Sequence, residues 1–588
     1  MARDVAGHPA RGSMPSVFKE RLRPGPLKGP TMDKKTILAI LLCILVWIVW
    51  QALFVEPQKP VRGPDGGTDA GAIAEKPKIQ ETEAAASKEP AERKPEERHV
   101  LRNDSVEIEF SSRGASARSI KILGFLHRKE DGKLEKDVPA DLVTGTGEFA
   151  WPFRIRFFDE KTSFKWPKYT DWEIESKESR KVSFVYRSAD EQPIPLIRKT
   201  FTLEEKGHLL ELEVEIQNHL QESIEEQILL EIPSTYQVIE ASGCMGCAGA
   251  PMVPRAPNCL ANGEIAAVET KPGSVVSREP SIGWTGINEQ YFLLAAVPVG
   301  VDKAACQLEA RQDKLMSASL MVPSVTLPPG GSTSHKVRIF CGPKQLDLLK
   351  SVKGGTGGES NPAGLERSVD FGWLAFLCLP MLWLLKAFYS LIGNYGVAII
   401  FLTLVVRLLM QPLTNKQMKS MKAMASLKPF MDEIKKKYGD DKARYNEEIM
   451  KLYKTHGVSP LTGCLPMLLQ MPIWIALYRT LYSSVELYQS AFIPGWIDDL
   501  SYRDPYFILP IAMGVGMFLQ QKFTPTTADP AQAKMMLYMM PALFTFLMLY
   551  LPAGLVLYIF VSSLLSIANQ IWFNKKTSQA AAQAPGTR

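Results

Sequence analysis

The chain has 588 residues, of which 46% are hydrophobic and 22% are charged, and its formal net charge is +6. This length is too great for one ordinary domain, and the net charge is too small to argue for a nucleic-acid partner. Large apolar side chains are scarce over residues 56–99 and dominate residues 371–573, which excludes both a single soluble globule and a disordered chain. The sequence contains no nucleotide-binding, zinc-protease or serine-hydrolase motif, so we expect no enzymatic activity, no catalytic residue, no cofactor and no metal ion.

Residues 36–55 form the first apolar run, with one polar member. A helix of this length measures roughly 30 Å, the thickness of the hydrocarbon layer, so the run predicts a transmembrane anchor helix. Residues 1–35 carry eight Lys or Arg against three acids, which places the N-terminus in the cytoplasm and the next segment outside. A cleaved signal peptide is the alternative, but the stretch before Glu56 lacks a small-x-small cleavage site. Because Met32 reads as a natural start, we interpret residues 1–31 as a start-site extension.

The segment after the anchor divides into a linker and a folded domain. Residues 56–99 contain six prolines and few large apolar side chains, so we expect a disordered exported linker. Residues 100–345 contain many runs in which apolar and polar residues alternate, as in Val106-x-Ile108-x-Phe110. This period of two predicts strands that each bury one face, and many such strands between Gly and Pro turns favour an all-β sandwich.

Cysteines are concentrated in this exported domain, where an oxidising compartment favours disulfides. They are Cys244, Cys247, Cys259, Cys306 and Cys341. We predict one or two structural disulfides and a leftover thiol. The alternative is a metal or redox site formed by Cys244, Cys247 and Cys259, which lie in a loop rich in Gly and Pro.

Apolar runs follow in the C-terminal half, and the charges between them indicate how they cross the membrane. The runs are 371–391, 395–413, 464–484, 505–521, 535–551 and 553–573. If all of them crossed, the loop 414–462, with eleven Lys or Arg and six acids, would lie outside, against the positive-inside rule. If 371–391 does not cross, both this loop and the tail 574–588 become cytoplasmic. We therefore predict five core transmembrane helices and an interfacial amphipathic helix at 371–391 within the connecting segment 346–394, with a tilted span as the alternative.

Loop 414–462 has a helical pattern that is interrupted at Gly439-Asp440-Asp441. An aspartate at the N-cap accepts hydrogen bonds from the first backbone N–H groups of a helix, so Asp440 or Asp441 is expected to begin a second helix. The loop is thus predicted to form a basic helical hairpin in the cytoplasm.

Arg407 is the most unusual residue of the predicted core spans, because these spans contain no Asp or Glu. An arginine in the hydrocarbon layer costs a few kcal/mol unless it is paired or hydrated. It must reach water, lipid headgroups or a group on a passing molecule, and snorkelling to phosphates is the alternative to a functional role. Thr403 lies one turn away on the same helix face. Polar side chains of other helices, such as Gln470, Gln521 and Ser562, could line a wet cavity with them.

Motifs along residues 371–573 occur in an order that is typical of one family. They include Gly393-Asn-Tyr-Gly, Thr403-Leu-Val-Val-Arg407, Ser459-Pro-Leu-Thr-Gly-Cys464, Trp474-Ile-Ala-Leu-Tyr478, Asp504-Pro-Tyr-Phe-Ile-Leu-Pro510 and Pro552-Ala-Gly-Leu-Val-Leu-Tyr558. In these motifs the C-terminal half resembles the YidC/Oxa/Alb family of membrane protein insertases. The exported half resembles the large periplasmic domain of the Gram-negative type, through Arg113-Gly114 and the stretch from Trp284 to Pro298. The resemblance implies a β-sandwich similar to sugar-mutarotase folds.

The resemblance also implies a function and a site. The implied function is that of an inner-membrane insertase and folding chaperone whose hydrophilic groove is open to the cytoplasm and closed outside. The residues that we assign to the groove are Arg407, Thr403, Gln470, Gln521 and Tyr558. In the family, the client's apolar helix moves along an apolar helix surface, here called the slide. The positions that match it are Met471, Trp474 and Leu547. The implied partners are nascent membrane-protein clients, the Sec translocon (SecYEG and SecDF), membrane lipids, and the ribosome or the signal recognition particle pathway, with no nucleic-acid target.

Two features of the C-terminal half and one of the exported half depart from this family. One is Ile559, which stands where many relatives have a second aromatic residue after the position of Tyr558, and the other is the tail after Phe573, which is too short and weakly basic for the ribosome contacts of longer tails. The loop from Cys244 to Cys259 is a third departure, because it does not match a feature of the family. A solute transporter with an exported binding domain is the alternative function, although the core spans show no internal repeat. A membrane-tethered sugar enzyme is a third hypothesis, which needs paired carboxylates or a base in a pocket of the sandwich.

Overall fold

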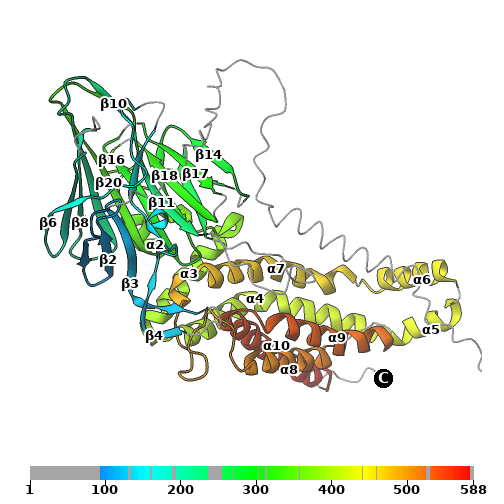
Figure 1. The fold of residues 1–588 in the computed structure, drawn as a ribbon. Helices are drawn as coiled ribbons and strands as arrows, with labels where there is room; N and C mark the ends of the chain where they lie inside the picture. Colours follow the sequence, from blue (N-terminus) through cyan, green and yellow to red (C-terminus); the bar gives the residue numbers. More distant parts are fainter. Residues whose placement is uncertain are drawn as a thin grey trace, which may run out of the picture. The chain divides into compact units, whose positions relative to one another are not determined.

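The computed structural model describes most of the chain from residue 93 onward (Figure 1). The described residues are 93–129, 134–158, 162–188, 194–235, 255–268, 271–301, 303–311, 314–355, 358–439, 441–457, 460–524 and 530–582. Within these ranges the described side chains exclude 442, 460–470, 530–532 and 576–582. The predicted anchor 36–55, most of the predicted linker and the Cys244–Cys247 pair lie outside the described residues.

Antiparallel sheets make up the domain that follows, here called the β domain. The largest has nine strands in the order β13-β12-β15-β16-β20-β9-β8-β7-β6. Its strands are β6 (Glu173–Lys177), β7 (Lys181–Tyr186), β8 (Leu196–Leu203), β9 (Leu209–Gln217), β12 (Ala256–Ala261), β13 (Glu264–Ala267), β15 (Ile282–Asn288), β16 (Phe292–Val299) and β20 (Ser332–Pro343).

Three smaller sheets complete the β domain. The five-stranded sheet runs β14-β17-β18-β11-β5, with β5 (Arg154–Phe157), β11 (Ile228–Thr235), β14 (Ser274–Arg278), β17 (Ala305–Ala310) and β18 (Leu315–Met321). The four-stranded sheet runs β1-β2-β3-β4, with β1 (Arg98–Arg102), β2 (Val106–Ser111), β3 (Ser116–Arg128) and β4 (Leu134–Asp141). The last sheet pairs β10 (Ile224–Glu226) with β19 (Val325–Leu327).

One continuous hydrophobic core joins the sheets, because alternate side chains of each strand point inward. Leu210, Leu212 and Val214 of β9 are buried in it, and the glutamates between them face the other way. Phe110 of β2 and Leu230 of β11 belong to the same cluster, so the four-stranded and five-stranded sheets share the core with the nine-stranded sheet. The structure therefore confirms the predicted β-rich domain whose strands bury one face.

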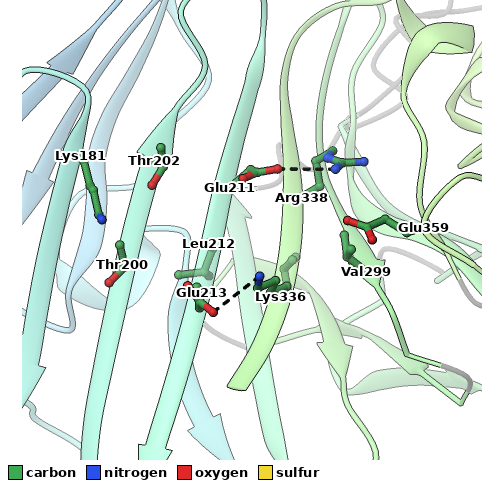
Figure 2. Close-up of a pocket in the computed structure, with 11 residues that line it drawn as sticks. Lys181, Thr200, Thr202, Glu211, Leu212, Glu213, Val299, Lys336, Arg338 and Glu359 are labelled. Atoms are coloured by element: carbon green, nitrogen blue, oxygen red, sulfur yellow. Dashed lines mark hydrogen bonds and ion pairs between the residues drawn. The ribbon is translucent and has the colours of Figure 1, made fainter. Parts of the chain in front are cut away.

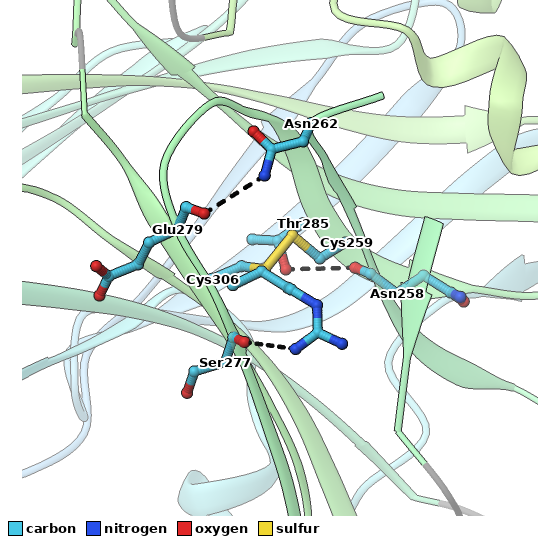
Figure 3. Close-up of a disulfide and its surroundings, with 8 residues drawn as sticks. Asn258, Cys259, Asn262, Ser277, Glu279, Thr285 and Cys306 are labelled. Atoms are coloured by element: carbon cyan, nitrogen blue, oxygen red, sulfur yellow. Dashed lines mark hydrogen bonds between the residues drawn. A yellow bond between two sulfur atoms is a disulfide. The ribbon is translucent and has the colours of Figure 1, made fainter. Parts of the chain in front are cut away.

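A disulfide between Cys259 and Cys306 crosses from β12 of the nine-stranded sheet to β17 of the five-stranded sheet (Figure 3). Both cysteines are fully buried, and 47 residues separate them in the sequence. Cys341 in β20 is a free buried cysteine, and burial raises the pKa of its thiol. The prediction of a structural disulfide with a leftover thiol is thus confirmed for the described cysteines of this domain. Because Cys259 is bonded to Cys306, it is not a thiolate ligand of the alternative metal or redox site.

The core of the β domain also contains a lysine. Lys199 of β8 is fully buried, and its Nζ donates to the carbonyl oxygens of Ala115, Phe153 (2.6 Å) and Gly114 (3.3 Å). Burial lowers the pKa of Lys199 well below its usual value, and the charge of Arg154 lowers it further. The three acceptors match the three N–H donors of an ammonium group. All three carbonyl residues have positive φ, which is strained at Ala115 (42°) and Phe153 (75°), so Lys199 holds together two strained turns.

The α-helices of the described residues follow the β domain. They are α2 (Leu346–Ser351), α3 (Ala375–Ile392), α4 (Tyr395–Ser426), α5 (Lys428–Tyr438), α6 (Lys442–Thr455), α7 (Pro460–Ser483), α8 (Ile508–Phe523), α9 (Pro530–Met548) and α10 (Ala553–Ala582). Short 3-10 turns also occur, at η2 (Glu148–Ala150), η4 (Leu365–Ser368), η5 (Gly372–Leu374) and η6 (Val485–Leu487).

The ends of α4 and α6 can be compared with the helix boundaries predicted from the sequence. Asp441 caps α6 by accepting from the backbone N–H groups of Ala443 and Arg444, which confirms the predicted cap between α5 and α6. The predicted transmembrane helix 395–413 lies within α4, which continues to Ser426 in one piece. Pro412 lies inside it, and the Lys, Met and Ala residues that follow are strong helix formers.

The helices pack into a bundle in which α4 contacts α3, α7 and α10, while α8 contacts α9 and α10. Leu402 of α4, Leu477 of α7 and Tyr558 of α10 are buried in one cluster. The backbone of α8 approaches α9 closely, since a methyl group at Gly514 would lie 2.0 Å from Oγ1 of Thr545. Such small residues permit close helix packing where lipid removes the usual hydrophobic drive.

Three helices of the described residues are long and apolar enough to cross a membrane, namely 372–392, 395–426 and 553–575. The first of them includes α3, so its length and composition allow a span as well as an interfacial helix. Trp373 and Trp383 are more than half exposed at this helix, as aromatic anchors at an interface would be. The interfacial position of α3 stays a prediction.

The strand β3 contacts the loop between α7 and α8. Arg128 forms an ion pair with Asp499, and its guanidinium lies 4.7 Å from the ring centroid of Tyr488. Gln489 exchanges two hydrogen bonds with the backbone of Leu126, at 2.8 and 2.5 Å. A charged group, a ring and an amide therefore join the β domain to this loop.

We predict that Lys199→Met lowers the stability of the β domain by about 2–4 kcal/mol, because three buried carbonyls lose their donor. The measurement is calorimetric unfolding of the full chain in detergent. Lys206→Met is the matched control, since Lys206 is exposed on the loop that follows β8. Equal stability of the two variants would show that the lysine is not needed to hold the strained turns.

We also predict that replacing Cys259 and Cys306 together by serine lowers this stability by about 2–4 kcal/mol, the usual effect of losing a disulfide that closes a loop of this size. Calorimetry measures the loss, and mobility on non-reducing gels verifies that the bond is absent. Adding a reductant to the serine variant should change nothing further. A further loss on reduction would mean that another disulfide carries the stability.

Candidate functional site

Arg407 lies in α4, and its guanidinium is bonded to α10. Nε donates to Oγ of Ser562 at 2.9 Å, and Nη2 donates to the same oxygen. Tyr558, one turn earlier in α10, lies within range of an electrostatic interaction with Arg407. In the described part of the chain, no ion pair joins Arg407 to a carboxylate. The structure thus brings together Arg407, Ser562 and Tyr558, which the sequence singled out on two helices.

A second polar contact lies one turn further along α4. Nε2 of Gln411 donates to Oδ1 of Asn569 in α10 at 2.6 Å and to Oδ1 of Asn415 at 3.4 Å. Gln411, Asn415 and Asn569 are not among the site residues predicted from the sequence. The spacing in the sequence could have indicated the two residues of α4. Arg407, Gln411 and Asn415 are four residues apart and therefore share one helix face. The polar face of α4 therefore extends beyond Arg407 to Gln411 and Asn415.

Other residues assigned to the groove do not join this cluster. Thr403 is fully buried, and its hydroxyl donates to the backbone carbonyl of Ile399 at 2.6 Å, so it is satisfied within α4. Gln521 is half-buried near the end of α8, and among the described residues no hydrogen bond joins its side chain to Arg407. The side chain of Gln470 lies outside the described residues. Their assignment to the groove stays a prediction.

The predicted slide residues lie at the surface of the helices. Met471 and Trp474 of α7 are half-buried, and Trp474 packs on the helical core. Leu547 of α9 is half-buried as well. Beside it runs a more exposed apolar stripe of α9, formed by Met535, Met539, Leu543 and Phe546. Their spacing of three or four residues places them on one face, which is where lipid or another apolar helix would contact α9.

A pocket on the nine-stranded sheet provides a test of the sugar-enzyme hypothesis (Figure 2). It lies over β7, β8, β9 and β20 and includes two carboxylates of β9, Glu211 and Glu213. Glu211 lies 3.5 Å from Arg338, and Glu213 lies 3.9 Å from Lys336, while Ser334 also donates to Glu213 at 2.8 Å. Acids that are paired across strands in this way are typical of a solvated sheet face. A third carboxylate, Glu359, also lines the pocket, so the pairing of Glu211 and Glu213 with cations of β20 does not by itself decide the sugar-enzyme hypothesis.

Together, the fold and this site define a class: a polytopic membrane protein that combines an apolar helical bundle, an arginine bonded across two helices and a large β domain. The family model described as 60Kd inner membrane protein matches residues 387–580, and the model described as YidC periplasmic domain matches residues 98–384. A protein named membrane protein insertase YidC, from Pelobacter propionicus, is 32% identical over 567 residues, covering 92% of this chain and 99% of its own length. The chain belongs to the YidC family of membrane protein insertases. It is accordingly an inner-membrane protein with a periplasmic domain, and it is not an enzyme.

Solved structures also resemble this chain. The crystal structure of an active YidC insertase with its first transmembrane domain resolved covers 81% of this chain and 92% of its own, with 18% identity and a TM-score of 0.35. A putative aldose 1-epimerase from Escherichia coli K12 covers 42% of this chain and 99% of its own, with 10% identity and a TM-score of 0.27. The family models and the curated relative do not support the alternative of a solute transporter.

Proposed function

We propose that this chain inserts newly made proteins into the inner membrane through a hydrophilic groove built around Arg407. The observation that carries the proposal is the bonding of this arginine. A guanidinium has five N–H donors, and within the described residues two of them are used, both on the single hydroxyl of Ser562. Such a group is costly as a purely structural element of an apolar bundle. It is well suited to bind a polar group that enters for a short time.

The proposed orientation places both termini and the α5–α6 hairpin in the cytoplasm and the β domain in the periplasm. Lys435, Lys436 and Lys437 form the last turn of α5, and the positive-inside rule favours the cytoplasm for such a cluster. The loop between α7 and α8 contains Glu486 and Asp499, which is compatible with the outer side. Five core helices, α4, α7, α8, α9 and α10, would then cross the membrane. The hairpin would receive clients or their delivery factors.

The physical problem for an insertase is the polar outer segment of its client. Each unpaired backbone group costs several kcal/mol in hydrocarbon. A groove open to the cytoplasm shortens the dry path, and α8, with 16 residues, is about 24 Å long and shorter than the hydrocarbon layer. A short helix of this kind thins the bilayer locally. The free-energy barrier that the client's polar segment must still cross, on the outer side of Arg407, is therefore lower.

The driving force comes from the client in this proposal. Its apolar helix leaves the groove along Met471, Trp474 and Leu547, and its burial in lipid releases about 25 cal/mol per Å² of apolar area. Thr403, Gln470, Gln521 and Tyr558 complete the groove wall. Cooperation with the Sec translocon (SecYEG and SecDF), and delivery by the ribosome or the signal recognition particle, belong to the proposal on the strength of family membership alone.

We predict that proteoliposomes containing only this chain and lipid insert a small single-span client with a short acidic tail, without nucleotide. Insertion is measured as protection of the tail from added protease. Protection should exceed that in empty liposomes, because burial of the client helix supplies the free energy. If the folded protein gives no protection, autonomous insertion is wrong and the chain acts only beside a translocon.

We predict that Arg407→Ala slows insertion of the acidic-tailed client about tenfold, since a barrier increase of about 1.4 kcal/mol has this effect. A client with a neutral tail should change less than twofold, and Arg407→Lys should be milder because it keeps the charge. Initial rates of protease protection provide the measurement. Lys534→Ala, which removes an exposed cation of α9, is the control and should leave both rates unchanged. Equal slowing of the acidic and neutral clients by Arg407→Ala would rule out the role of charge.

A further inference from the structure

Three side-chain amides, Gln411 and Asn415 of α4 and Asn569 of α10, form a cluster next to the arginine, here called the amide cluster. Gln411 donates to both asparagines, at 2.6 Å to Asn569 and at 3.4 Å to Asn415. Asn569 donates to the sulfur of Met418 at 3.8 Å. All three amides are half-buried, so their side chains are neither sealed inside the bundle nor fully in solvent.

Among the described residues, some hydrogen-bonding groups of the amide cluster have no partner. Each side-chain amide has two N–H donors and one carbonyl acceptor. Gln411 uses its donors, and among the described residues its Oε1 accepts no hydrogen bond. Within the same residues the Nδ2 group of Asn415 donates none, and that of Asn569 has only the weak sulfur contact. The cluster therefore offers one acceptor and one donor group without any charge.

We propose that the amide cluster binds the backbone peptide groups of the client's polar segment as this segment passes Arg407. The inference rests on the proposed insertase function and deepens it. An extended polypeptide has one N–H and one C=O at each ordinary residue, and an amide side chain can pair with both. Gln411 Oε1 would accept from a client N–H, and Asn415 Nδ2 would donate to a client carbonyl. This recognition depends on the client's backbone N–H and C=O groups and not on the charge of its side chains.

Arg407 and the amide cluster would then bind different parts of the client. Arg407 selects for acidic side chains, because its charge acts on charge. The amide cluster stabilises the main chain of every client, acidic or neutral, because every client has a main chain. A bridge between α4 and α10 is the simpler role for these amides, and interhelical amide bonds do stabilise membrane bundles. A mere bridge, however, would be indifferent to the number of N–H groups in the client.

The test uses the full chain in proteoliposomes and synthetic single-span clients with neutral tails of equal length. One tail is rich in serine and glycine, and the other is rich in proline, which lacks the backbone N–H. The variant is Gln411→Met, which keeps the length of the side chain and removes its hydrogen bonds. Gln520→Met is the matched control, an equal change at a half-buried amide of α8. Thermal unfolding of each variant verifies the fold.

We expect Gln411→Met to slow insertion of the serine-glycine tail about fivefold and of the proline-rich tail less than twofold. An acidic tail of the serine-glycine type should be slowed as much as the neutral one, unlike the effect of Arg407→Ala. Asn415→Leu should slow both the serine-glycine and the proline-rich tail, because both retain carbonyl oxygens. Equal slowing of the two neutral tails by Gln411→Met, or no slowing of either, would overturn the inference. If the unaltered chain inserts no client at all, the proposed function fails and this inference fails with it. If the unaltered chain inserts clients and the variants do so equally fast, only this inference fails.

Discussion

The bond between Arg407 and Ser562 is the interaction on which the helical half of the molecule depends. A guanidinium between apolar helices must be satisfied or hydrated, and α4 and α10 meet so that one hydroxyl accepts from two of its nitrogens. The same two helices meet again at Gln411 and Asn569. Because these contacts are made by side chains and not by helix backbone, they fix how α4 and α10 face each other. The polar side of the bundle is therefore formed by the faces of α4 and α10 that these contacts hold together.

Features with a local cause could be predicted from the sequence. The alternation at Val106, Ile108 and Phe110 depends only on the period of a strand, and these residues are fully buried in β2. The cap at Asp441 depends on a carboxylate that stands beside free N–H groups, which is also local. Helices at the apolar runs of the C-terminal half could be predicted from the length and composition of these runs. Membership of the insertase family followed from ordered motifs and is shown by relatives that match most of the chain.

Features that depend on which elements meet could not be predicted in this way. Five exported cysteines allow many pairings, and the bond from Cys259 to Cys306 requires knowing that β12 and β17 lie in facing sheets. Thr403 shares a helix face with Arg407, yet its hydroxyl bonds to Ile399 within α4, because a threonine in a helix can satisfy itself. Gln411 is an ordinary polar residue until Asn569 of α10 is placed against it. For Cys259 and for Gln411, the tertiary structure decides which residue becomes the partner.

Two basic side chains, the fully buried Lys199 and the half-buried Arg407, show how structure separates support from recognition. Lys199 has three donors and three carbonyl acceptors, so nothing remains for a ligand, and its surroundings are the strained turns of the β domain. Arg407 has five donors, and the described residues occupy two of them with one oxygen. A saturated cation stabilises the fold, since every group it contacts would be unpaired without it. An unsaturated cation costs stability instead, and a protein that keeps one has a use for its remaining donors. This reasoning supports the proposal that the arginine, and not the lysine, serves the function.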